Sequence, residues 1–194
     1  MIISLIASKG GTGKTTTALY LACAAKKASP DMTVTVLDAD PQRSALDWAT
    51  DAAAASDPLP FDVLPADADT IDALEGHEGE LVVIDTAPGF DTSMRSIIDR
   101  SDVCIIPTSP NPLDVRRAWK TVDVCDGKAV ILVTKANMRT VNFRQTLESL
   151  NGDGDVSFFD SVVRNSVRYA QAFGTNPRKL YDYADVWQEL KEAL

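Results

Sequence analysis

Ser8 to Thr16 reads SKGGTGKTT. This stretch follows an apolar run at residues 2–7 and precedes a segment rich in Ala and Leu, which is the strand-to-helix context of a phosphate-binding loop. Its glycines let backbone N–H groups turn toward phosphate oxygens, while Lys14 adds a cation and the Thr15 hydroxyl can ligate Mg²⁺. The residues expected to hold a nucleotide here are Gly10, Gly11, Thr12, Gly13, Lys14, Thr15 and Thr16.

Short apolar runs alternate with helical patterns along the rest of the chain. The runs are nearly continuous in Val, Ile and Leu, which is typical of strands covered by helices on both faces. The pattern therefore predicts an α/β fold with a doubly wound, mostly parallel sheet of the P-loop NTPase type. The runs expected to form strands are 2–7, 33–37, 61–64, 81–84, 103–107, 129–134 and 156–159.

Three segments have clear helical patterns. Residues 15–28 end before Pro30, and residues 41–55 begin with a proline, which suits a first helical turn. The closing segment, 185–194, is amphipathic and is expected to pack on the sheet. Its apolar face consists of Val186, Trp187, Leu190, Ala193 and Leu194. We find no linker of interdomain length, and we expect one domain over residues 1–194.

Composition limits the possible functions. The formal charge of −9 disfavours binding to nucleic acid except through a local basic patch. Cys23, Cys104 and Cys125 lack a CxxC spacing, and His77 has no second histidine with which to share a metal. No apolar run approaches the length of a membrane span, and no signal peptide precedes the loop, so we expect a cytoplasmic protein without a membrane role.

Three carboxylates end predicted strands. Asp38 and Asp40 close the second run, and Asp85 closes the run at residues 81–84. Ligands bind at the carboxyl ends of strands in open α/β sheets, so these side chains are expected beside the phosphate loop. Mg²⁺ needs few protein oxygens and keeps several waters. The predicted metal residues are Thr15, Asp40 and Asp85.

Three motifs together resemble the ParA/MinD family of ATPases with a deviant phosphate loop. They are Lys9 before the paired glycines, LDADPQ at residues 37–42 and VVIDTAPG at residues 82–89. The segments SALDW at residues 44–48 and VVRNSVRYAQAFG at residues 162–174 are most similar to the small plasmid-partition ParA proteins. The loop begins within ten residues of Met1, which leaves no room for the amino-terminal DNA-reading domain of larger ParA proteins. Sequence-specific autoregulation is therefore not expected.

This resemblance implies Mg²⁺-dependent ATP hydrolysis in a homodimer that forms on ATP binding. Lys9 would reach the partner's phosphates, where a cation offsets the charge that develops in phosphoryl transfer. Asp40 would orient the attacking water, Lys14 would hold the leaving oxygens, and Asp85 would support the metal. Asp38 would act behind these groups or help to position the water.

The resemblance also suggests where base and DNA would bind. Lys135 and Asn137, which follow the sixth predicted strand, are the candidate adenine contacts. A basic patch in the carboxyl-terminal third would bind DNA without sequence preference, through phosphate contacts that weaken as salt increases. Its candidate residues are Arg164, Arg168, Arg178 and Lys179. Solvated surface charges are the alternative interpretation.

The resulting hypothesis is a cytoplasmic ATPase, nucleoid-associated in its ATP-bound form, that positions plasmid or chromosomal cargo through a ParB-like or other adaptor. A protein cargo, such as a carboxysome or chemoreceptor cluster, would require the same chemistry. A metabolic ligase resembling dethiobiotin synthetase is the alternative from another class. The DPQ and DTAPG stretches favour the partition branch over this ligase.

Overall fold

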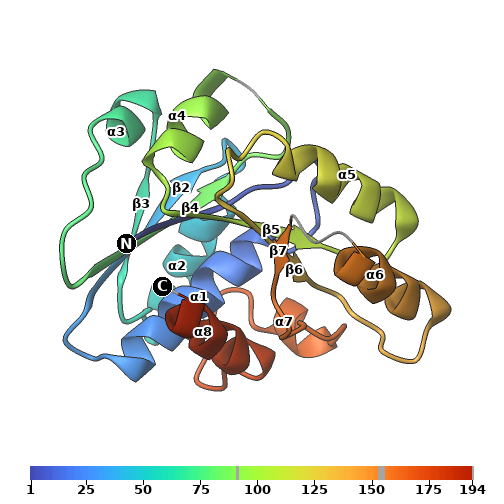
Figure 1. Cartoon of the computed structure of the whole chain (residues 1–194). Coiled ribbons are helices and arrows are strands. Elements are labelled where there is room, and N and C mark those ends of the chain that lie inside the picture. The colour runs from blue at the N-terminus through green and yellow to red at the C-terminus, as the bar shows by residue number, and fades with distance from the viewer. Residues whose placement is uncertain (91, 153–155, 194) are drawn as a thin grey trace.

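The structure is a computed structural model that describes residues 1–90, 92–152 and 156–193. Its strands form one parallel sheet in the order β3-β2-β4-β1-β5-β6-β7 (Figure 1). Each of the seven predicted runs overlaps one strand, so the doubly wound α/β prediction is confirmed. The strands are β1 (Ile2–Leu5), β2 (Thr33–Ala39), β3 (Asp62–Pro65), β4 (Glu80–Thr86), β5 (Val103–Thr108), β6 (Ala129–Val133) and β7 (Ser157–Phe158).

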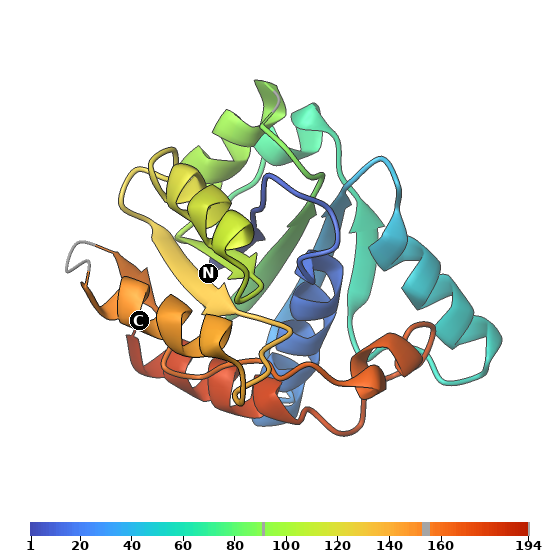
Figure 2. The same cartoon turned by 90° about the vertical axis from the view of Figure 1, so that its right-hand side faces the viewer.

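Helices cover both faces of the sheet (Figures 1 and 2). One layer contains α1 (Lys14–Ala28), α2 (Ser44–Ala54), α7 (Val167–Gln171) and α8 (Asp182–Ala193). The other contains α3 (Ala68–Asp72), α4 (Thr92–Arg100), α5 (Pro112–Val122) and α6 (Val141–Gly152). This two-sided cover explains why the central strands are apolar on both faces: every residue of β5 is buried.

Helix α2 begins three residues later than predicted, at Ser44 rather than Pro41. The chain first makes a turn in which the Arg43 amide donates to the Asp40 carbonyl at 2.8 Å and Arg43 adopts a left-handed φ of 54°. The proline therefore lies in this turn rather than in the first turn of the helix.

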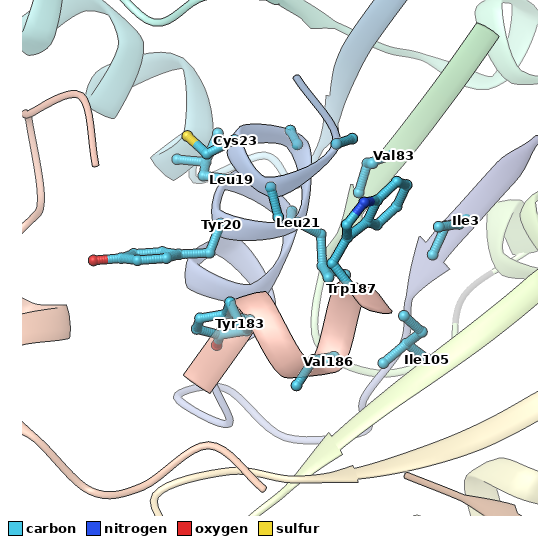
Figure 3. Close-up of a cluster of buried hydrophobic side chains, with 14 of the residues drawn as sticks. Ile3, Leu19, Tyr20, Leu21, Cys23, Val83, Ile105, Tyr183, Val186 and Trp187 are labelled. Atoms are coloured by element: carbon cyan, nitrogen blue, oxygen red, sulfur yellow. The ribbon is translucent and has the colours of Figure 1, made fainter. Parts of the chain in front are cut away.

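Helix α8 packs against α1 at the centre of the core (Figure 3). Of its predicted apolar face, Val186, Trp187 and Leu190 are buried, as expected. The prediction is wrong for Ala193, which is exposed together with the two residues before it because the last turn of α8 does not pack on the core. Leu194 lies outside the described residues. Tyr183 shares a hydrogen bond of 2.9 Å with the hydroxyl of Thr17 in the first turn of α1. Helix α8 thus fixes the helix end that follows the glycine-rich loop.

The strand register brings the predicted acidic positions together. Asp85 of β4 is in register with Asp38 of β2 on one side and with Leu5 of β1 on the other. The chain continues from β1 into the glycine-rich loop, so both carboxylates lie at the carboxyl ends of their strands, behind that loop. Among the described residues, no helix has the length and apolar character needed to cross a membrane.

Candidate functional site

The glycine-rich loop is held in an open turn before α1. Gly11 and Gly13 have φ values of 76° and 101°, a region that side chains with a Cβ rarely adopt. The Thr134 hydroxyl donates to the carbonyl of Thr12 at 2.8 Å, and the Lys135 ammonium donates to the carbonyl of Gly11 at 2.5 Å. The loop is therefore tied to the end of β6, with the amino end of α1 facing the space in front of it.

A cleft of about 710 Å³ lies in front of the loop. All the predicted phosphate-contacting residues line it, and so do Asp40 and Lys135. Asn137 is not among the lining residues. Its side-chain oxygen accepts from the Arg139 amide at 3.2 Å in a local turn. The volume lies within the range of roughly 300–1,000 Å³ that is usual for small-molecule sites.

Asp85 is the least satisfied polar residue of the site. Its side chain is fully buried, and neither carboxylate oxygen accepts a hydrogen bond from the described residues. Burial raises the pKa of Asp85 to about 7, although the nearby Thr15 hydroxyl and Lys14 ammonium oppose the rise. Burial also lowers the pKa of Lys14, against the attraction of Asp85 and Asp40. The loop thus contains a buried cation beside a carboxylate that lacks hydrogen bonds.

This donor set fits Mg²⁺ bound together with a nucleotide. An unpaired buried carboxylate and a hydroxyl close to it are both hard oxygen ligands, which Mg²⁺ prefers. No group of three or more His, Cys, Asp or Glu side chains that could hold a metal occurs in the described part of the chain. A cation here would therefore need phosphate oxygens or water to complete its ligands.

Asp38 and Asp40 are close in sequence but make different contacts. Asp38 is buried and accepts from the amides of Ala45 and Leu46, both at 3.0 Å, and from the Asp40 amide at 3.1 Å. Burial raises its pKa, and these backbone donors oppose the rise. Asp40 is only half-buried, and one of its oxygens accepts from the Gln42 amide at 2.9 Å. Asp38 therefore anchors the start of α2, whereas Asp40 keeps an oxygen available to the cleft.

Lys9 points away from the cleft in front of its own loop. Its ammonium lies 3.0 and 3.2 Å from the two oxygens of Asp114 in the first turn of α5. Asp114 is buried and also accepts from the Ser109 hydroxyl and from Arg117, and it keeps a lowered pKa despite its burial because of these donors. The side chain of Lys9 remains 51% exposed. The ion pair holds Lys9 on the surface of its own chain.

The four candidate DNA residues differ in their contacts. Arg164 pairs with Asp182, and Arg178 pairs with Asp57. Arg168 lies over the ring of Tyr181 at 5.1 Å and makes no ion pair with a described residue. The same is true of Lys179, which is exposed. Arg168, Arg178 and Lys179 line one hollow, whereas Arg164 lines the cleft in front of the loop.

Comparisons with known proteins agree with this geometry. The model of the CobQ/CobB/MinD/ParA nucleotide binding domain matches residues 3–177. The chain belongs to this family. The "Maintenance of carboxysome distribution protein A" of Gloeobacter kilaueensis is 36% identical over 126 residues, which are 62% of this chain and 55% of that protein. The chain spans about half the length of the curated relatives it matches.

Solved structures of the family share the fold. A variant of McdA from Cyanothece in complex with ATP has a TM-score of 0.78 at 18% identity, covering 99% of this chain and 95% of that one. A plasmid partition protein from Borrelia burgdorferi B31 bound to AMPPNP has a TM-score of 0.74 at 16% identity, covering 99% and 97%. At such identities the likeness establishes the architecture alone.

The far wall of this family member's cleft was not predicted as a nucleotide contact. Residues 163–167, 169 and 170 form it together with Phe173, and Tyr183 of α8 adds to it. Ala136 and Arg164 form a parallel bridge, which continues the sheet edge beyond β6 and brings this segment beside the loop. The family resemblance suggests DNA contacts for the arginines of this segment. Its place after the last strand of the sheet was the signal for a ligand-facing position.

Proposed function

We propose that this chain binds Mg²⁺·ATP in the cleft and hydrolyses it. The observation that carries the proposal is the buried Asp85 carboxylate, which has no hydrogen-bond partner among the described residues and lies near Lys14 behind the phosphate loop. Leaving such a group unpaired is costly unless a ligand compensates. A nucleotide-bound cation is the compensation that this site is built to accept.

Different residues of the chain would hold the phosphates, the metal, the attacking water and the base. Backbone amides of the loop and the Lys14 ammonium hold the phosphate oxygens, and Thr15 and Asp85 hold the metal side. Mg²⁺, when bound, neutralises charge on the phosphates. The exposed oxygen of Asp40 orients water for attack, while Asp38 fixes the backbone of that turn through its amide contacts. Base contacts come from Lys135 and from the far wall of the cleft.

Lys9 acts between two copies of the chain in this proposal. Its side chain is half-exposed, pairs with Asp114 and does not line the cleft of its own chain. A role at a partner's phosphates therefore requires release of this ion pair. Only the Lys9 end of this pair is exposed, but the buried Asp114 would keep its contacts with Ser109 and Arg117 after Lys9 leaves. Release of Lys9 should therefore cost only about 1 kcal/mol, which ATP-driven dimerisation can offset. ATP binding would thus be coupled to homodimer formation.

The ATP-bound dimer binds DNA without sequence preference in this proposal. Arg168 and Lys179 carry the interaction, because no described carboxylate neutralises them. Arg164 and Arg178 already hold Asp182 and Asp57 and contribute less. Two unpaired cations in this patch of each protomer, on a net acidic chain, predict weak, strongly salt-dependent binding that needs the dimer. The protein would be cytoplasmic and associate with the nucleoid in its ATP state.

Co-sedimentation with DNA tests this proposal, using ATP, ADP or no nucleotide at two salt concentrations. ATP-dependent, salt-sensitive binding is expected, and Arg168→Glu with Lys179→Glu should abolish it. The control, Lys27→Glu with Arg100→Glu, makes the same change in net charge elsewhere and should bind normally. ATP turnover without DNA binding in the wild type would refute positioning on DNA. A metabolic ligase would then be the better explanation.

Two kinds of cargo are candidates, and the ATPase would position either one through a ParB-like or other adaptor. Plasmid or chromosomal DNA is favoured by the likeness of residues 44–48 and 162–174 to small partition proteins. A protein cargo is favoured by the 36% identity to a protein named for carboxysome distribution. Fluorescent tagging in the source cell, with a plasmid and a protein compartment as markers, distinguishes them. Focus spacing that follows one marker and is lost in the Lys14→Ala variant identifies the cargo.

A further inference from the structure

Helices α5 and α6 border a groove that the proposed ATPase chemistry does not use. Its volume is about 320 Å³, and none of its lining residues lines the nucleotide cleft. On the α5 side the wall is apolar, with Pro112, Val115 and the partly exposed Trp119. The α6 side carries hydrogen-bonding groups without charge. These are Asn142, Gln145, Thr146 and Ser149.

Exposed apolar side chains gather at the start of both helices. Leu113 at the start of α5 is 60% exposed, Val141 at the start of α6 is 56% exposed, and Met138 just before α6 is 57% exposed. Single exposed apolar residues are ordinary, but several beside one apolar-lined groove are typical of a surface that binds a partner.

The surroundings of the groove are basic although the chain is acidic. Helices α5 and α6, which border the groove, together contain four Lys and Arg against two Asp and Glu, whereas the whole chain has a formal charge of −9. Arg116 lines the groove, and the exposed Lys120 lies one helical turn further along α5. Neither makes an ion pair with a described residue. An acidic partner would therefore find unneutralised cations here.

We propose that this groove binds an acidic polypeptide segment that inserts apolar side chains between α5 and α6. The apolar wall of Pro112, Val115 and Trp119 selects aliphatic or aromatic anchors, and Arg116 and Lys120 select carboxylates beside them. DNA is a poorer occupant, because a single cation lines the groove and its other walls offer phosphates no charge. The inference does not depend on ATP hydrolysis, since the groove and the nucleotide cleft share no lining residue.

Trp119 provides the readout for a test on the full chain. The structure buries Trp48 and Trp187, so a change in tryptophan emission on binding reports mainly on Trp119. The probe is a synthetic peptide of about 15 residues with Leu and Phe at helical i, i+4 spacing and Asp and Glu between them. Saturable binding with a blue shift of the emission is expected, and Trp119→Phe should remove the shift while the peptide still binds by fluorescence anisotropy.

Charge and sequence controls decide the outcome. Arg116→Glu with Lys120→Glu should weaken peptide binding at least about tenfold, as expected for loss of two charge contacts. The variant Lys27→Glu with Arg100→Glu should leave it unchanged. A peptide with Lys in place of Asp and Glu, or with Ser in place of Leu and Phe, should bind poorly. Absence of binding by the acidic peptide at millimolar concentration, equal binding of the Lys peptide, or displacement by a DNA duplex would overturn the proposal. ATP turnover, measured in the same preparations, tests the proposed function separately.

Discussion

Replacing Asp85 by Asn should change how the stability of the nucleotide-free protein depends on pH. The carboxyl group is fully buried, and its oxygens accept no hydrogen bond from the described residues. Its pKa is raised by burial to about 7. As pH increases, the unfolded chain releases this proton first, near its ordinary value, and the folded chain holds it until about pH 7. Ionisation of Asp85 therefore lowers the free energy of unfolding across that window.

The size of the effect follows from the same shift. A pKa raised from the ordinary value of 3.8 to about 7 corresponds to about 4 kcal/mol at high pH. About 1.5 kcal/mol of this is already lost at about pH 5, so about 2 to 3 kcal/mol remains to be lost between about pH 5 and about pH 8.5. Asn cannot ionise and should not show this loss. The variant should gain stability relative to the wild type by that amount over this interval.

Urea unfolding at the two pH values measures the effect, with magnesium and nucleotide absent. Asp62→Asn, which removes an exposed carboxylate on β3, is the matched control and should follow the wild type closely. Because each comparison is a difference between proteins at one pH, titrations common to both cancel. Parallel pH dependences for wild type and Asp85→Asn would refute the inference that Asp85 is a buried, unpaired acid awaiting a cation.

Three further substitutions probe the cleft and the Lys9 ion pair. Lys14→Ala should weaken binding of Mg²⁺·ATP by about a hundredfold in calorimetry, because a buried cation is lost from the phosphates. Asp40→Ala should keep this affinity but lower turnover at least about a hundredfold. It should therefore accumulate as an ATP-bound dimer, which light scattering detects. A variant that stays monomeric with ATP while the wild type dimerises would contradict this. Asp114→Asn should free Lys9 and raise the dimer fraction at limiting ATP by about two- to fivefold, and an unchanged fraction would show that the ion pair does not restrain dimerisation.

The regular parts of the fold could be predicted because they depend on local patterns. Each apolar run overlaps a strand, and the glycine-rich loop lies between β1 and α1 as its spacing indicated. The start of α2 was predicted three residues too early. Its first amides donate to the side chain of Asp38 on the preceding strand, a contact that the helical pattern does not indicate. Helix α8 is present but begins at Asp182, three residues before the predicted start, and Ala193 is exposed although the periodicity placed it on the apolar face.

The site was predictable to the extent that it lies within one motif. The loop residues and the strand-end carboxylates follow from sequence order and parallel register. Contacts between segments that are distant in the sequence could not be predicted in this way. Nothing in the sequence indicates that Lys9 pairs with Asp114, or that Arg164 and Arg178 find Asp182 and Asp57. A count of cations in a segment therefore overestimates the charge available to DNA.

The resulting picture separates three kinds of charged residue by what surrounds them. Asp85 and Lys14 are buried in the cleft wall and gain most from a ligand, because low solvent exposure strengthens every charge contact. Lys9 is half-exposed and pairs with a buried carboxylate that has other donors, so little free energy is lost when Lys9 leaves it for a partner. Arg116, Lys120, Arg168 and Lys179 make no ion pair with the described residues and lie on the surface. No described carboxylate neutralises these four cations, so they remain available to an acidic partner such as DNA or a polypeptide.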